Sequence, residues 1–123
     1  MRKIPESRVF KTAWFDKAAR KARIGDPALL AAIREVMNRQ ADDLGGGVYK
    51  KRLNDNMHRS IVLAMGGRHW VFAYLFAKKD RANIDSAELV AFKKLAQGYG
   101  RMRDAEFASA LNQGDLLELS DEE

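Results

Sequence analysis

The hydrophobic period of the chain changes at Val48. Before this residue, apolar side chains recur every three or four positions, which predicts amphipathic helices. From Val48 to Lys79 they alternate with a period close to two, which predicts strands. Two helices followed by consecutive strands favour an α+β domain, because such strands pair antiparallel and the helices pack on their sheet.

The first half of the sequence predicts three elements: a short strand over residues 7–10 and helices over residues 12–23 and 26–42. Gly25 suits the left-handed position just past a helix end. Asp26 and Pro27 suit the N-cap and the first position of the second helix, and Gly45-Gly46-Gly47 is expected to break that helix. The side chains expected to face the core are Trp14, Phe15, Ala18, Ala22, Leu29, Leu30, Ile33, Val36 and Met37.

The second half predicts three consecutive strands over residues 48–53, 57–65 and 69–79. Asn54-Asp55-Asn56 and Gly66-Gly67 are turn sequences that would join these strands into an antiparallel meander. The aromatic residues of the third strand are expected to alternate onto one face, under the helices: Trp70, Phe72, Tyr74 and Phe76.

A third helix is expected to begin at Asp85. Asp85 and Glu88 fit a capping box, and Ile84 and Leu89 fit a hydrophobic staple. The expected buried stripe of this helix is Leu89, Phe92, Leu95, Ala96 and Tyr99. Two further elements are expected: a helix over residues 104–113 that ends at Gly114, and either an edge strand or a docked segment over residues 116–119.

These elements predict one α+β domain over residues 1–123. Its small antiparallel sheet is a three-stranded meander with a candidate N-terminal strand. The sheet packs against two N-terminal helices and one or two C-terminal helices.

Charge is distributed unevenly along the chain. All 22 basic residues and 10 of the 17 acids precede Asp104, a net charge of +12; the other seven acids lie in residues 104–123, which contain no base. A body of this charge favours a polyanionic partner. The short acidic tail over residues 115–123 either folds back over the body and weakens non-specific RNA binding, or is a solubilising end.

Several classes of protein are not expected from the composition. The absence of cysteine excludes disulfide scaffolds and thiolate metal sites, and with two histidines we expect neither a metal nor another cofactor. No apolar run approaches the roughly 18 residues of a membrane span, and the first residues do not resemble a signal peptide. We therefore expect a soluble cytoplasmic protein with no membrane partner.

Basic residues gather on the predicted strands. Alternation places Lys50 and Arg52 on one face of their strand and Lys51 on the other. Because neighbouring strands lie about 4.8 Å apart, these residues, Arg59 and either Lys78 or Lys79 are expected to form a patch the size of one or two nucleotides. A self-repelling patch of this kind favours an anionic ligand. The alternative is that these are edge-strand cations that discourage aggregation.

Four segments resemble a known family. GGGVYKKRL over residues 45–53 and FAKKDRANI over residues 76–84, which leads into the helix with Glu88, are similar to RelE-type toxins of bacterial type II toxin–antitoxin modules. FKTAWF over residues 10–15 and LLEL over residues 116–119 are similar to the HigB-like branch. The resemblance covers nearly the whole chain and implies the RelE-like fold.

The resemblance also implies an activity and partners. RelE-type toxins are endoribonucleases that cleave mRNA in the ribosomal A site and so halt translation. A co-expressed antitoxin neutralises them, and in this branch it is usually a helix-turn-helix protein that represses the operon. The expected partners are thus the antitoxin, the ribosome and mRNA, with operator DNA bound only through the antitoxin.

By motif position, five residues match the catalytic set. Lys50 or Arg52 would activate or position the 2′-hydroxyl, with Lys50 the better base because arginine stays protonated and a lysine in a positive cluster has a lowered pKa. Arg59 would hold the scissile phosphate, and Lys79 with Arg81 would stabilise the transition state and the leaving group. The expected RNA-binding residues are Tyr49, Lys51, His58 and Lys78.

Two departures from the family pattern leave alternatives open. Some members carry a tyrosine or histidine for proton transfer soon after the last basic strand, whereas Ala82 to Asp85 contain neither; Tyr49 and His58 are candidates to substitute. Residues 54–58 also replace a longer, glycine-rich basic loop. The alternatives are a gyrase-inhibiting toxin of the related ParE type and a catalytically weakened RNA-binding or antitoxin-binding member.

Overall fold

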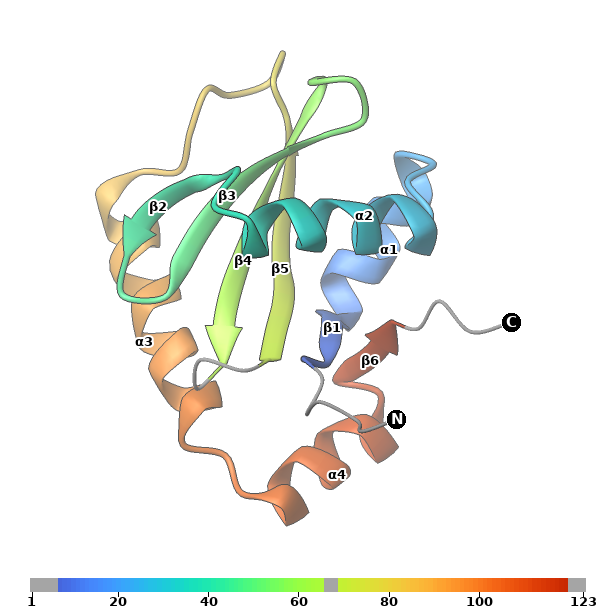
Figure 1. Ribbon diagram of the computed structural model, residues 1–123, viewed down its shortest axis with the longest axis vertical. Helices are drawn as coiled ribbons and strands as arrows, with labels where there is room; N and C mark the ends of the chain where they lie inside the picture. The colour runs from blue at the N-terminus through green and yellow to red at the C-terminus, as the bar shows by residue number, and fades with distance from the viewer. Residues whose placement is uncertain (1–6, 66–68, 120–123) are drawn as a thin grey trace.

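A computed structural model describes residues 7–65 and 69–119, which form an α+β fold around a six-stranded sheet (Figure 1). The strand order in the sheet is β2-β3-β4-β5-β1-β6. In chain order the elements are β1 (Val9–Thr12), α1 (Ala13–Lys21), α2 (Asp26–Met37), β2 (Asp42–Gly45), β3 (Val48–Leu53), β4 (His58–Met65), β5 (His69–Ala77), α3 (Ser86–Gly100), α4 (Asp104–Gln113) and β6 (Leu116–Leu119).

The sheet is larger than the sequence predicts and is mixed. The antiparallel meander β3-β4-β5 is confirmed. However, β1 pairs parallel with β5 and antiparallel with β6, so it is an interior strand between the meander and the C-terminal strand. The expectation of a small, wholly antiparallel sheet is therefore wrong, because the chain passes through α1 and α2 before it enters the meander at the far edge.

The second helix ends earlier than predicted, and an extra strand replaces its last turn. After α2 ends at Met37, Arg39 takes a left-handed conformation with φ 65°. The chain then extends as β2, in which Asp42 pairs with Lys50 of β3. Gly45, Gly46 and Gly47 all have positive φ; Gly45 ends β2, and Gly46 and Gly47 form the turn between β2 and β3. These glycines therefore do not break a helix, contrary to the prediction.

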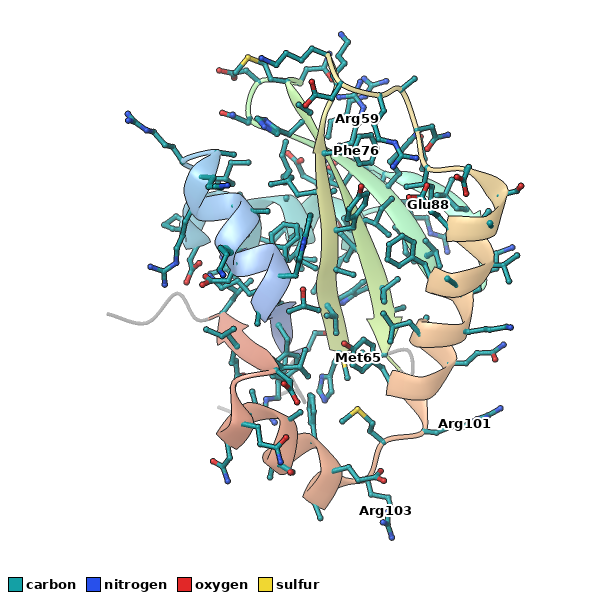
Figure 2. All side chains as sticks on the ribbon, turned by 180° about the vertical axis from the view of Figure 1, so that it is seen from behind. Arg59, Met65, Phe76, Glu88, Arg101 and Arg103 are labelled. Atoms are coloured by element: carbon teal, nitrogen blue, oxygen red, sulfur yellow. The ribbon has the colours of Figure 1, made fainter. Side chains whose placement is uncertain are left out.

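Helices cover both faces of the sheet. Figures 1 and 2, which view the molecule from opposite sides, show α2 in front in the first and α3 in front in the second. The α1/α2 side contains a buried cluster that includes Leu29, Ile33, Val62 and Phe72. The α3 side contains a second cluster that includes Val48, Ile61, Leu63 and Phe76.

The aromatic residues of β5 do not share one face as predicted. Trp70 and Phe72 pack with the α1/α2 cluster, whereas Tyr74 and Phe76 pack with the α3 cluster. The cause is a β-bulge: Ile61 pairs with Tyr74 but its neighbour Val62 pairs with Phe72, which leaves Ala73 as an extra residue. An extra residue reverses the alternation that follows it.

The junction of α1 and α2 also differs from the prediction. Gly25 has φ −91° and is the N-cap of α2, while the left-handed residue is Arg23, with φ 61°. Asp26 begins the helix instead of capping it, and its carboxylate accepts a hydrogen bond from Lys11 at 2.9 Å. Pro27 is the second residue of α2, one position later than predicted.

Three residues expected in the core are exposed. Trp14, Met37 and Leu95 keep 53%, 42% and 40% of their surface accessible. Their neighbours Phe15, Val36 and Ala96 are buried, so the helices lie close to their predicted orientations and these three residues lie at the margins of the buried stripes.

Several local predictions are confirmed. Asp85 and Glu88 form the capping box of α3. The bounds of α4 agree with the prediction, and Gly114 ends it with φ 81°. Residues 116–119 form the edge strand β6. The side chain of Glu118 in this strand forms an ion pair with Arg8, at a distance of 2.7 Å. The predicted Gly66-Gly67 turn and the end of the acidic tail lie outside the described residues.

Among the described helices, none has the length and apolarity needed to cross a membrane.

Candidate functional site

Three predicted site residues share the α3 side of the sheet. Lys50 and Arg52 follow Val48 at two-residue intervals along β3, and Val48 packs with the α3 cluster. Arg52 lies directly opposite Arg59 of β4. We call Lys50, Arg52 and Arg59 the cationic strip. Figure 2 shows Arg59 at one end of the sheet, next to Phe76 of β5, which is its partner in the ladder.

The opposition of Arg52 and Arg59 is unfavourable without a ligand. Like charges directly opposite each other on one face of a sheet destabilise it. Arg52 is exposed, and within residues 7–65 and 69–119 its side chain has no hydrogen-bond or ion-pair partner. An anion bound between the two guanidinium groups would relieve this repulsion and supply both with acceptors.

The turn between β3 and β4 holds Arg59 in place. Nη1 of Arg59 donates to the backbone carbonyls of Asn56 at 3.0 Å and His58 at 3.3 Å. Asn54, Asp55 and Asn56 all have positive φ, between 54° and 70°. This conformation costs free energy in residues other than glycine, although asparagine and aspartate tolerate it best. In this strained conformation the carbonyl of Asn56 points at Arg59 and accepts its hydrogen bond.

Lys50 lies at the β2 side of the strip. Its Nζ is 3.7 Å from Oδ2 of Asp42, and its side chain is only 16% exposed. Lys50, Arg52 and Asp42 line an open hollow of about 380 Å³. Asp42 is not predicted as a site residue from the sequence, because residues 42–43 fall at or beyond the expected end of a helix.

A second hollow contains three other predicted residues. His58, Lys78 and Lys79 line an open space of about 560 Å³ together with the exposed Met57. Both lysines are exposed, and neither has a side-chain partner within the described part of the chain. The His58 ring is hydrogen bonded to the Asn54 amide at 3.2 Å. The structure thus places Lys78 and Lys79 in a hollow beside the cationic strip, and Arg59 is not among the residues that line it.

Two predicted RNA-binding residues lie on the opposite side of the sheet. Lys51 pairs with Glu35 of α2 at 2.6 Å and donates to the carbonyl of Gln40 at 3.1 Å. Tyr49 packs edge-on against Trp70, at a centroid distance of 5.6 Å, beside the α1/α2 cluster. These contacts attach α2 to β3 and hold both side chains on the face away from the cationic strip, although Lys51 also lines the hollow that contains Lys50 and Arg52.

Arg81 is bound to a carboxylate. Its guanidinium donates to both oxygens of Glu88, at 2.6 and 3.0 Å, and to the hydroxyl of Tyr74 at 3.3 Å. The hydrogen bonds to Glu88 raise the pKa of Arg81, and those from Arg81 lower the pKa of Glu88. Arg81 also lies over the Phe76 ring, 5.5 Å from its centroid. Its charge is therefore compensated, unlike that of Arg52.

Taken together, the described residues offer cations for an anionic ligand. No group of three or more histidine, cysteine or acidic side chains that could hold a metal ion occurs among them. Three cations from two adjacent strands can bind a phosphodiester and stabilise negative charge that develops on its oxygens.

Comparison with known proteins identifies the family. The family model described as the RelE toxin of the RelE / RelB toxin-antitoxin system matches residues 7–119. The chain belongs to the RelE toxin family. No curated protein and no solved structure gives a significant match. Membership of the RelE family confirms the toxin–antitoxin resemblance and implies an antitoxin partner. The six-stranded mixed sheet and four helices are compatible with a RelE-like fold.

Proposed function

We propose that this RelE-family toxin is a ribosome-dependent mRNA endoribonuclease of the HigB-like branch, which inhibits translation in the cytoplasm. The observation that carries the proposal is the pairing of Arg52 with Arg59 in register, with Lys50 two residues away on the same face. This arrangement supplies fixed positive charge where a pentavalent phosphorane would form, and fixed charges of this kind stabilise transition states effectively.

The proposed reaction is a transfer within the RNA. Lys50 is the proposed general base for the proton of the 2′-hydroxyl, because arginine side chains do not lose theirs. The 2′-oxygen then bonds to the adjacent phosphorus while the bond to the 5′-oxygen breaks, and water protonates the departing oxygen. Arg52 and Arg59 bind the non-bridging oxygens. The products are a 2′,3′-cyclic phosphate and a 5′-hydroxyl end.

The remaining predicted residues are assigned lesser roles. We propose that Lys78, Lys79 and His58 bind the RNA backbone on one side of the cleaved bond, since they line the hollow beside Arg59. Arg81 holds Phe76 and the start of α3, because Glu88 already compensates its charge. This compensation is also the observation that favours the second candidate, a member with weakened catalysis.

The proposed antitoxin is a co-expressed helix-turn-helix protein that also represses the operon. The toxin would then contact operator DNA only through this partner. Co-purification of the toxin with the product of a neighbouring reading frame, followed by a test of operator binding with and without the toxin, examines this arrangement.

Primer extension on a translated mRNA tests the nuclease function. The wild-type toxin should produce discrete cleavage sites only while the message is translated, and Arg59→Ala and Lys50→Ala should abolish them. Lys94→Ala, at an exposed position on α3, is the matched control and should cleave like the wild type. A 2′-deoxy substitution at the cleaved nucleotide should block the reaction. Inhibition of DNA gyrase without mRNA cleavage would instead establish a ParE-type activity.

A further inference from the structure

Trp14 is the second residue of α1, and its indole is 53% exposed. The indole stacks on the ring of Tyr74 in β5, with centroids 5.1 Å apart and planes inclined by 29°. The pairing of β1 with β5 ends at Phe72, so Tyr74 lies on the part of β5 beyond that pairing. An indole left half in water loses part of the free energy that full burial would provide. Its exposed surface is therefore available to a ligand.

The position of the Tyr74 ring is fixed from several sides. Its hydroxyl accepts a hydrogen bond from Arg81, which Glu88 holds in turn. The rings of Phe76 and Phe92 lie 5.7 and 5.9 Å from it. Trp14 therefore rests on a rigid base, and a rigid ring binds a flat ligand at a low cost in conformational entropy.

One cross-strand pairing and two ring contacts connect Trp14 to the cationic strip. Arg59 is paired with Phe76 across β4 and β5. The Phe76 ring is 5.7 Å from that of Tyr74, which is 5.1 Å from that of Trp14. Trp14 thus lies within two ring spacings of the residue beside Arg59. This separation suits a nucleotide that flanks the phosphate held by the strip.

Unpaired positive charge accompanies the indole along α1. Lys17 and Lys21 follow Trp14 by three and seven residues, which places all three on one side of the helix. Both lysines are exposed and have no side-chain partner within residues 7–65 and 69–119. Cations that alternate with an exposed aromatic ring are typical of surfaces that bind single-stranded nucleic acid.

On the basis of the proposed nuclease function, we infer that Trp14, supported by Tyr74, stacks on an unpaired base of the mRNA that flanks the cleaved bond. Trp14 is then a positioning residue. It places the phosphodiester at Arg52 and Arg59 and takes no part in proton transfer. Every base has a π-face, so the stack favours RNA without selecting a sequence.

Indole fluorescence tests the stacking directly. In a Trp70→Phe background, Trp14 is the only tryptophan of the chain. A single-stranded hexaadenylate should quench its fluorescence, and an abasic oligomer of equal length and charge should quench it far less. Trp14→Ala should weaken hexaadenylate binding about 5- to 150-fold, the range for one lost base–aromatic stack, while Trp14→Phe keeps most of the affinity. Equal quenching by both oligomers would overturn the inference.

Cleavage separates this inference from the proposed function. Trp14→Ala should raise KM for a translated mRNA and leave kcat within a few-fold of the wild type, whereas Arg59→Ala should abolish cleavage. A wild-type protein that cleaves and a Trp14→Ala variant with unchanged KM would refute the stacking alone. A wild-type protein that does not cleave, yet shows base-dependent quenching, would refute the nuclease function alone.

A protein contact is the competing explanation of the exposed indole. If Trp14→Ala abolishes neutralisation by the antitoxin but leaves hexaadenylate binding unchanged, Trp14 belongs to a protein interface and the inference fails. A thermal melt of each variant verifies that the fold is retained, which is expected because half of the side chain is in water.

Discussion

Nζ of Lys11, in strand β1, lies 2.6 Å from Oδ1 of Asp16 in helix α1, and both side chains are largely buried. The same ammonium donates to Asp26 at the start of α2. One lysine thereby joins the first strand to both N-terminal helices. Replacing Asp16 leaves Lys11 with Asp26 as its carboxylate partner, and breaking a buried ion pair costs more free energy than losing a surface pair.

This relationship predicts a defined pH dependence of stability. The Lys11 ammonium lowers the pKa of Asp16, so the stabilisation is complete above the unfolded value of about 3.9 and is lost as the pH falls through the lowered pKa. The carboxylates outweigh burial and raise the pKa of Lys11, so at the alkaline end the stabilisation is lost only as the pH rises through that raised value. Urea unfolding of the wild type and Asp16→Asn across pH should show a flatter acid limb for the variant. Parallel acid limbs would contradict this account.

Arg52→Gln should stabilise the free toxin while it impairs cleavage. The substitution removes the repulsion from Arg59, and we expect a gain of about 0.2–1 kcal/mol, typical of cross-strand pairs. Denaturant unfolding at low and high salt measures the gain, which should shrink as salt screens the charges. Lys94→Gln is the control for a cation without a facing arginine. A loss of stability in Arg52→Gln at low salt would show that the two arginines do not repel.

Arg81 and Arg59 should differ in their contribution to the rate of mRNA cleavage. Arg81→Ala should reduce the cleavage rate much less than Arg59→Ala, because Glu88 already neutralises the Arg81 charge. Its main effect should be to loosen the start of α3, which amide hydrogen exchange at residues 86–90 would detect. If the two variants lose equal activity, Arg81 acts on the substrate directly.

The β3–β4 turn predicts contrasting effects at Asn56. Asn56→Val should destabilise the fold by about 1–2 kcal/mol, because a β-branched residue is strained at φ 70°. Asn56→Gly keeps the carbonyl that holds Arg59 and relieves the strain, so its stability should match or exceed that of the wild type. Chemical denaturation compares the two. Equal stability of the valine and glycine variants would show that the conformation is not strained.

Lys51→Met should affect folding and not RNA. Its ammonium binds Glu35 and the Gln40 carbonyl on the side of the sheet away from the cationic strip. The variant should unfold at lower denaturant concentration yet cleave mRNA at the wild-type rate per folded molecule. Retained stability with lost RNA binding would restore Lys51 to the RNA-binding set that the sequence predicts.

Local patterns predict the parts of this fold that depend on neighbours in sequence. The bounds of β3 follow from alternation up to the Asn54 turn, and the start of α3 follows from Asp85 and Glu88. The parallel pairing of Val9 with Trp70 joins residues that are far apart in the chain, and no local pattern indicates it. The bulge at Ala73 likewise depends on the register of β4 against β5.

The candidate site also has features that the local sequence predicts and features that depend on tertiary contacts. The common face of Lys50 and Arg52 follows from the two-residue period of a strand, and the opposition to Arg59 follows from the length of the turn. The partners that take Lys51 and Arg81 out of the strip, Glu35 and Glu88, come from helices. Because a charge pattern does not show which carboxylate lies nearby, sequence alone predicts too many free cations.

The interior position of β1 constrains how the molecule assembles during synthesis. The strand made first has β5 on one side and β6 on the other, so its second edge stays open until residues 116–119 emerge. An open edge accepts any extended chain nearby, and non-local pairings of this kind form slowly. During synthesis the toxin therefore passes through a stage in which the edge of β1 is unpaired. At this stage a co-translated polypeptide can pair with β1 before β6 does.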